Sequence, residues 1–188
     1  AGRSLVGHVL HAVSALKPSN TRVVVGAGRE KVEEHLAAIA PHVTTIFQEH
    51  RGGTGHAAQL ALAGLDAKGT ILILAGDTPL ITSETLFDFY RDHIESERNL
   101  SLLTVEASDP FGYGRVIRDE RDNLLGVREE RDASEFERAI TEINTGVYLV
   151  NSVFLNQALG SLSPNNSQGE YYLTDIITIF RSEEHTSE

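Results

Sequence analysis

The stretch Ile71-Leu72-Ile73-Leu74-Ala75-Gly76-Asp77-Thr78-Pro79 decides the fold of this chain. Its first five residues form a continuous apolar run of strand length, which is typical of a central parallel strand covered on both faces. The turn that follows ends the strand and places Asp77 just beyond its carboxyl end. Open α/β sheets bind their ligands at that edge, so Asp77 is the first candidate site residue.

Helices and strands alternate on both sides of this stretch. Before it, apolar periodicity predicts helices over 5–16, 32–39 and 56–62 and strands over 23–25 and 43–47. After it, a helix capped by Thr82 or Ser83 is expected to run to Ile94, and a strand to cover 100–105. This alternation predicts a doubly wound, mostly parallel α/β fold.

The alternation of helices and strands ends in the last third of the chain. Residues 115–118 and 124–128 flank a short turn and predict an antiparallel hairpin, which we expect as a layer inserted over the sheet. A short polar helix, a strand over 147–150 and helices near Phe154 and over 171–180 should follow. We expect one domain over 1–180. Residues 181–188 lack apolar periodicity and are expected to form a polar tail, with a non-native sequence and an ordinary frayed terminus as the two interpretations.

Composition excludes several classes of function. A net charge of −11 over 188 residues disfavours nucleic acid as a partner, because no basic field exists to replace its counterions. A small anion can still be held by local cations, backbone N–H groups or a metal. The chain has no cysteine, no apolar run near the roughly 20 residues of a membrane helix, and no signal-peptide layout at its start. We therefore expect a cytoplasmic protein without a membrane segment.

Several residues admit more than one role. Asp77 suits Mg²⁺, which takes one or two protein carboxylates plus phosphates, but it could equally cap the turn at Thr78. The loop 52–55 could bring its backbone close to a ligand or be a flexible turn, and it lacks the Gly-Lys-Ser/Thr of a Walker loop. His56 begins a helix without a second histidine at ligand spacing. Glu129 lies among Glu130 and neighbouring arginines, which is typical of a solvated ion-pair cluster.

Five segments, taken in order, are more specific than any of these residues alone. They are Gln48-Glu-His-Arg-Gly-Gly-Thr-Gly-His-Ala57, Ala75-Gly-Asp-Thr-Pro-Leu80, Asp109-Pro-Phe-Gly-Tyr-Gly-Arg115, Glu142-Ile-Asn-Thr-Gly146 and Asn166-Ser-Gln-Gly-Glu-Tyr-Tyr-Leu-Thr-Asp175. This set closely resembles the uridylyltransferase domain of the bifunctional bacterial enzymes that make UDP-N-acetylglucosamine. The resemblance covers residues 1–180. The resemblance implies a Rossmann-like nucleotide-diphospho-sugar transferase fold.

The implied reaction is attack by the phosphate of N-acetylglucosamine-1-phosphate on the α-phosphate of UTP, with release of pyrophosphate. By resemblance, Gln48 would pair with the uracil edge, Gly53 and Thr54 would close around the base, and Gly76 would lie against the nucleotide. Asp77 would bind Mg²⁺.

By the same resemblance, Gly114, Glu129 and Asn144 would hold the acetamido sugar, which replaces the ion-pair interpretation of Glu129. Two positions depart from the pattern, since many relatives have Tyr in place of Ala75 and Lys in place of Arg131.

The resemblance also implies parts outside these residues. The family's first strand, its glycine-rich triphosphate loop and its catalytic lysine are expected before residue 1. An asparagine of the metal site is expected after residue 188, together with a hexapeptide-repeat acetyltransferase domain that makes a homotrimer. We therefore expect negligible activity from residues 1–188 alone and unpaired sheet edges. The rivals are a thymidylyl- or cytidylyltransferase, a non-catalytic nucleotide-binding module and a dinucleotide-dependent oxidoreductase.

Overall fold

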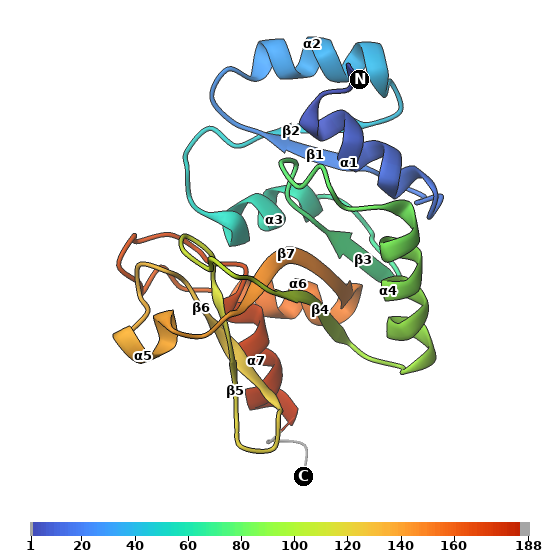
Figure 1. Cartoon of the computed structure of the whole chain (residues 1–188). Coiled ribbons are helices and arrows are strands. Elements are labelled where there is room, and N and C mark those ends of the chain that lie inside the picture. Colours follow the sequence, from blue (N-terminus) through green and yellow to red (C-terminus); the bar gives the residue numbers. More distant parts are fainter. Residues whose placement is uncertain (1, 185–188) are drawn as a thin grey trace.

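The computed structural model describes residues 2–184. Helices and strands alternate through the first half, and a hairpin and a long strand follow (Figure 1). In chain order the elements are α1 (Leu5–Ser14), β1 (Arg22–Val25), α2 (Arg29–Ile39), β2 (Thr44–Phe47), α3 (Thr54–Leu62), β3 (Thr70–Ile73), α4 (Ser83–Glu95), β4 (Leu100–Glu106), β5 (Arg115–Arg118), β6 (Leu124–Arg128), α5 (Glu135–Arg138), β7 (Glu142–Asn151), α6 (Ser152–Ser161) and α7 (Asp175–Glu184). The predicted helices and strands are therefore confirmed, with differences at their ends.

The strands form two sheets. Strands β1 and β2 make a parallel pair, and β7 pairs antiparallel with β3, β4 and β5 in a five-stranded sheet. The α/β class is confirmed, but the expectation of a mostly parallel sheet is wrong for the described pairings, because only β1–β2 is parallel. The run at 71–75 is likewise not flanked by parallel strands; β3 pairs with β7 alone among the described strands. Alternation along the chain could not reveal that β7, a late strand, inserts between β3 and β4.

Strands β1 and β3 each pair on one edge only within residues 2–184, which agrees with the expected unpaired edges. The hairpin of β5 and β6 is confirmed as antiparallel. It is not a separate layer, however. Arg115 pairs with Ile143 of β7, so the hairpin extends the main sheet through β7.

Strand β7 is longer than the 147–150 predicted, because its amino-terminal half also pairs with β4. The register shifts there: Val147 lies opposite Leu103, whereas Asn144 lies opposite Thr104. The extra residues form a bulge in which Gly146 has a φ of 75°, a conformation that favours glycine. The bulge changes the direction of the side chains that precede it, including that of Asn144.

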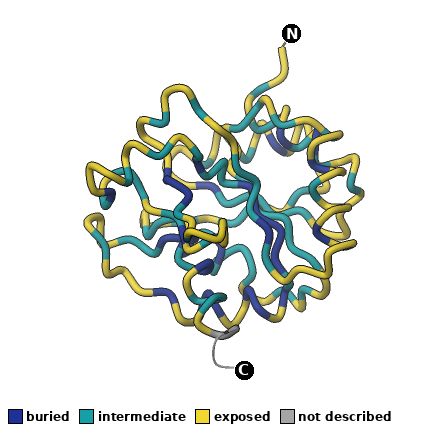
Figure 2. The backbone as a smooth tube through the Cα atoms, turned by 60° about the horizontal axis from the view of Figure 1, so that its bottom comes forward, coloured by how far each residue is buried: buried dark blue, intermediate teal, exposed yellow. Residues whose placement is uncertain are grey.

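Helices cover both faces of the main sheet. Figure 2 shows a buried stretch that runs through the middle of the molecule, with further buried segments towards its rim. Side chains alternate between the faces, as the pleat requires. On one face Leu72 and Val147 pack with α1 and α4; on the other Ile71, Ile73 and Tyr148 pack with α3, α6 and α7. The expected coverage of both faces of the 71–75 run is thus confirmed.

Three further boundaries matter for the site. Thr82 caps α4, since its side chain accepts a hydrogen bond from the N–H of Thr85. Helix α7 begins at Asp175 rather than 171, because the backbone of Tyr171 bonds to the loop 52–55 instead. Residues 181–184 belong to α7, so the predicted polar tail is helical there, and 185–188 lie outside the described residues. Within residues 2–184, no helix has both the length and the apolar character needed to cross a membrane.

Candidate functional site

One edge of the main sheet carries three of the eight expected site residues. Strands β3 and β4 both run antiparallel to β7, so their carboxyl ends meet at the amino-terminal end of β7. The loop after β3 carries Gly76 and Asp77, and the start of β7 carries Asn144. Topology alone therefore directs these residues towards one edge, the edge at which α/β sheets bind ligands.

Asp77 does not close the turn in which it lies. The Thr78 hydroxyl donates to the carbonyl of Ala75 at 2.9 Å, and the N–H of Ile81 donates to the carbonyl of Thr78 at 3.2 Å. The Asp77 side chain is exposed, and its carboxylate makes no hydrogen bond or ion pair with residues 2–184. The turn-capping interpretation therefore loses its support.

The chemistry around Asp77 fits Mg²⁺ better than a metal held by protein alone. Across residues 2–184, no group of three or more His, Cys, Asp or Glu side chains could hold a metal ion. Mg²⁺ usually keeps several waters and is bound through one or two carboxylates plus substrate phosphates. A single free carboxylate at the ligand edge of the sheet meets that requirement.

The glycines of the loop 52–55 are needed for chain packing. The N–H of Gly55 donates to the carbonyl of Tyr171, and the N–H of Tyr171 donates to the carbonyl of Gly52, both at 2.8 Å. A Cβ added at Gly53 would lie 2.5 Å from the carbonyl oxygen of Tyr171. The loop is thus held by Tyr171 and is not a freely flexible turn.

The same stretch around Tyr171 links the loop to Glu129. The Thr54 hydroxyl accepts a hydrogen bond from the N–H of Leu173 at 3.0 Å, and the hydroxyl of Thr174 donates to Oε1 of Glu129 at 3.2 Å. Thr174 is 3% exposed. Segment 171–174 therefore connects two groups of expected site residues that lie far apart in the sequence.

Gln48 and His56 face each other across the start of α3. The Nε2 atom of Gln48 donates to the carbonyl oxygen of Gly53 at 3.1 Å and lies 3.1 Å from Nδ1 of His56. A Cβ added at Gly52 would lie 2.5 Å from that same Nδ1. The side chain of Gln48 is therefore fixed by the loop that it precedes.

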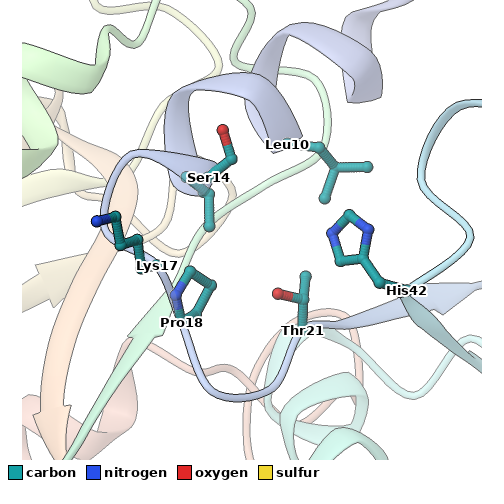
Figure 3. Close-up of a pocket in the computed structure, with 7 residues that line it drawn as sticks. Leu10, Ser14, Lys17, Pro18, Thr21 and His42 are labelled. Atoms are coloured by element: carbon teal, nitrogen blue, oxygen red, sulfur yellow. The ribbon is translucent and has the colours of Figure 1, made fainter.

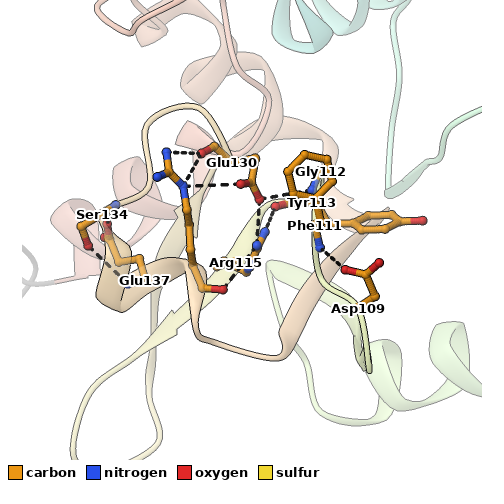
Figure 4. Close-up of polar contacts among 9 residues, drawn as sticks. Asp109, Phe111, Gly112, Tyr113, Arg115, Glu130, Ser134 and Glu137 are labelled. Carbon is orange, nitrogen blue, oxygen red and sulfur yellow. Dashed lines mark hydrogen bonds and ion pairs between the residues drawn. The ribbon is translucent and has the colours of Figure 1, made fainter.

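Glu129 and Glu130 have different surroundings. Burial raises the pKa of Glu129; the hydrogen bond from Thr174 opposes this, while the charges of Asp132 and Asp175 add to it. Glu130 instead pairs with the buried Arg115 at 2.7 Å, and this bond holds the pKa of Glu130 low (Figure 4). The ion-pair interpretation is thus correct for Glu130 and wrong for Glu129, which forms no ion pair with residues 2–184.

Gly114 and Asn144 complete this side of the site. The N–H of Asn144 donates to the carbonyl of Gly114 at 2.8 Å, and a Cβ added at Gly114 would lie 3.4 Å from Oε2 of Glu129. The Asn144 side chain accepts from the N–H of Gly146 and donates to the hydroxyl of Tyr148. The Tyr148 hydroxyl is buried, which raises the pKa of its phenol, and its oxygen accepts this bond. The bulge and Tyr148 together fix Asn144.

A series of hydrogen bonds, chain neighbours and one close approach, that of Glu129 to Gly114, links Gln48, Gly53, Thr54, Glu129, Gly114 and Asn144. Gly76 and Asp77 are directed to the same edge as Asn144 by topology, and within residues 2–184 no hydrogen bond or ion pair joins them to the series. Sequence reasoning missed Thr174, Tyr148 and the contact of His56 with Gln48. The motif at 166–175 marked the segment that carries Thr174, but nothing in it singled out that hydroxyl.

A cleft of about 180 Å³ lies elsewhere (Figure 3). It is formed by the end of α1, the loop that follows it and the residue His42 before β2, and it includes none of the expected site residues. Its lining residues are Leu10, Val13, Ser14, Lys17, Pro18, Thr21 and His42.

Comparison with known proteins gives relatives over nearly the whole chain. The chain is 43% identical over 189 residues to bifunctional protein GlmU of Thermobifida fusca and 46% identical over 187 residues to that of Streptomyces coelicolor. Each match covers 98% of this chain but 39% of the relative, so the chain spans about two fifths of the length of these relatives. The resemblance seen in the motifs is confirmed by these relatives.

Solved structures share the fold. A UDP-glucose pyrophosphorylase complexed with UDP-glucose has a TM-score of 0.68 at 13% identity, covering 95% of this chain and 75% of that one. A putative glucose-1-phosphate thymidylyltransferase from Bacillus anthracis has a TM-score of 0.75 at 16% identity, covering 95% and 70%. The Rossmann-like nucleotidyltransferase fold is therefore confirmed. The family model of the MobA-like NTP transferase domain matches residues 1–142 of this chain. The chain therefore belongs to this family of nucleotidyltransferases.

Proposed function

We propose that this chain forms the nucleotide- and sugar-binding part of an enzyme that transfers a uridylyl group from UTP to N-acetylglucosamine-1-phosphate. The products are UDP-N-acetylglucosamine, a precursor of the peptidoglycan cell wall, and pyrophosphate. The proposal combines the motif resemblance with relatives that are 41–46% identical to this chain. The single observation that carries it is the series of contacts from Gln48 to Asn144, because residues expected to hold a base and residues expected to hold a sugar lie along one continuous path.

Each group has a role that its chemistry permits. Gln48, Gly53 and Thr54 hold the uracil base, and Gly76 lies beside the nucleotide. Glu129 and Asn144 hold the hydroxyl and amide groups of the sugar next to Gly114, since carboxylate and amide oxygens accept hydroxyl donors.

Asp77 holds Mg²⁺, which neutralises the charge of the phosphates when it is bound. Phosphoryl and nucleotidyl transfer depend on positioning and charge neutralisation more than on covalent catalysis by the protein. Two substrates held at one sheet edge provide that positioning.

The remaining parts of the proposal concern the longer polypeptide. It carries the glycine-rich loop, the catalytic lysine and a second metal ligand, and it forms a homotrimer in the cytoplasm through an acetyltransferase domain. Residues 1–188 alone then have negligible activity, because the glycine-rich loop and the lysine that position the triphosphate belong to the longer polypeptide. Appreciable release of pyrophosphate by this chain, given UTP, the sugar phosphate and Mg²⁺, would refute that part.

The decisive experiment substitutes Asp77 by Asn in a polypeptide that extends this chain to the length of its relatives. Synthesis of UDP-N-acetylglucosamine should fall by at least about a hundredfold, because the metal loses its protein carboxylate. Asp66→Asn is the control, since Asp66 is exposed and, within residues 2–184, forms an ion pair only with the exposed Lys68 at 3.5 Å. Undiminished synthesis by the Asp77→Asn protein would contradict the proposal.

The rival functions give different results in the same assay. A cytidylyl- or thymidylyltransferase prefers CTP or dTTP over UTP. A non-catalytic module binds the nucleotide without turnover even in the longer polypeptide. An oxidoreductase requires a dinucleotide near Gly26.

A further inference from the structure

We propose that His56 is a specificity-determining positioning residue, which holds the Gln48 amide so that its oxygen faces the base and selects uracil over cytosine. This inference rests on the proposed function, in which Gln48 contacts the base. It concerns a side chain to which the motif resemblance gave no role.

The orientation of the Gln48 amide follows from its neighbours. The carbonyl oxygen of Gly53 can only accept, so the amide group 3.1 Å from it must be the nitrogen of Gln48. The other N–H of that nitrogen then points to Nδ1 of His56, also at 3.1 Å. Both amide N–H groups are used within the protein, and Oε1 is the end that remains available to a ligand.

The same contact fixes the tautomer of His56. An amide nitrogen donates and does not accept, so Nδ1 of His56 must be the acceptor and carries no proton. The neutral ring therefore bears its proton on Nε2. The ring occupies the space that a Cβ on Gly52 would need, since such an atom would lie 2.5 Å from Nδ1, so a glycine at position 52 leaves room for this position of the imidazole.

This arrangement discriminates between pyrimidine bases. Uracil presents an N3–H donor, which suits the oxygen of Gln48, whereas cytosine presents an unprotonated N3 and needs a donor. To accept cytosine, the Gln48 amide would have to turn over. That would break the bond to His56 and bring Oε1 against the carbonyl oxygen of Gly53. The lost hydrogen bond and the contact between two acceptor oxygens together favour uracil by about tenfold or more.

The first test measures kcat/KM for UTP and for CTP in the extended polypeptide, with N-acetylglucosamine-1-phosphate saturating. His56→Phe keeps a flat ring without an acceptor, and the UTP/CTP ratio should fall by about tenfold. His56→Asn places an oxygen near the position of Nδ1 and should restore most of the ratio. His35→Phe is the control, because His35 is exposed, lies outside the loop 52–55 and bonds Ser4 at 2.7 Å, so the ratio should stay unchanged.

The second test does not depend on activity. Nitrogen-15 NMR of the imidazoles in this chain should show the Nε2–H tautomer for His56, and a mixture of tautomers after Gln48→Leu. A protonated Nδ1 in the neutral ring, an unchanged ratio in His56→Phe, or an equal loss in His56→Asn would each overturn the inference. If the unmodified polypeptide makes no UDP-sugar, the proposed function fails, and the tautomer alone decides whether His56 holds Gln48.

Discussion

The hydroxyl of Thr54 accepts a hydrogen bond at 3.0 Å from the backbone N–H of Leu173, which lies 119 residues further along the chain. Leu173 is 4% exposed, so water cannot replace this acceptor at low cost. The bond joins the start of α3 to segment 171–174 and so holds the two groups of site residues together. Thr54 therefore has a structural role in addition to its proposed contact with the base.

Replacing Thr54 by Val should lower the free energy of unfolding by about 1–3 kcal/mol, because the N–H of Leu173 loses its acceptor. Thr54→Ser keeps the hydroxyl and should cost less than about 1 kcal/mol. Urea denaturation of both variants measures the difference. Equal stability of the Val and Ser proteins would show that the hydrogen bond does not matter.

Gly53→Ala should be among the most destabilising single substitutions in the loop. Gly53 has φ 93° and ψ 178°, a region open almost only to glycine, and its new Cβ would lie 2.5 Å from the Tyr171 carbonyl oxygen. A loss of about 3 kcal/mol or more is expected in thermal or urea unfolding. The control is Gly69→Ala, at φ 81° with open space around it, which should cost only about 1–2 kcal/mol for the backbone conformation.

The ion pair of Arg115 with Glu130 should contribute far more to stability than the exposed pairs. Arg115 is 2% exposed and also donates to the carbonyl of Tyr113 (Figure 4). Arg115→Met removes the main partner of Glu130, which keeps Arg138 at 3.4 Å, and also the donor to the Tyr113 carbonyl, so a clearly larger loss of stability is expected than for an exposed pair. In Arg98→Met the lost pair with Asp92 has side chains 51% and 61% exposed, so less than about 1 kcal/mol should be lost. Similar losses in both variants would contradict the burial argument.

Stability should fall as the pH drops below 6.5, in part because of His93. This histidine is 2% exposed, its Nδ1 lies 2.8 Å from the hydroxyl of Ser101, and burial, the main cause, lowers its pKa from 6.5. Below pH 6.5 the unfolded chain binds a proton that the folded chain excludes, so stability is lost as the pH falls towards the lowered pKa. The slope reaches at most about 1.4 kcal/mol per pH unit for one proton.

His93→Leu should flatten this slope while lowering stability at pH 8, where the bond to Ser101 is intact. Urea unfolding at several pH values between 8 and 5 measures both effects. An unchanged slope in the Leu protein would show that His93 is not a source of the pH dependence.

The sequence was sufficient for the elements and the family but not for the pairing of strands. Apolar period and turn residues identified β3, the hairpin and α4, because these signals are local. The position of β7 between β3 and β4 depends on packing across the sheet, and an apolar run such as Val147–Val150 is compatible with parallel or antiparallel neighbours. The start of α7 also depends on distant parts of the chain. The apolar spacing over 171–174 predicts a helix, but Tyr171 forms backbone hydrogen bonds with the loop 52–55, and the helix begins only at Asp175.

For the site, motifs identified candidate residues but not what holds them. Glu129 and Glu130 look alike in the sequence, and only the fold separates the one beside Thr174 from the one beside Arg115. The partners of Gln48 and Asn144 depend on side-chain directions set by a helix start and a bulge. Residue spacing carries no signal for such contacts.

The place of β7 in the main sheet has a consequence for biosynthesis. Strands β3 and β4 pair with β7, which begins at Glu142, and with no other described strand. During translation both strands are therefore made before their shared neighbour, and β3 in particular has its apolar side chains exposed and its hydrogen-bonding edge open until β7 follows. Nascent chains stalled before residue 142 should accordingly bind chaperones, and release from them should follow the emergence of β7.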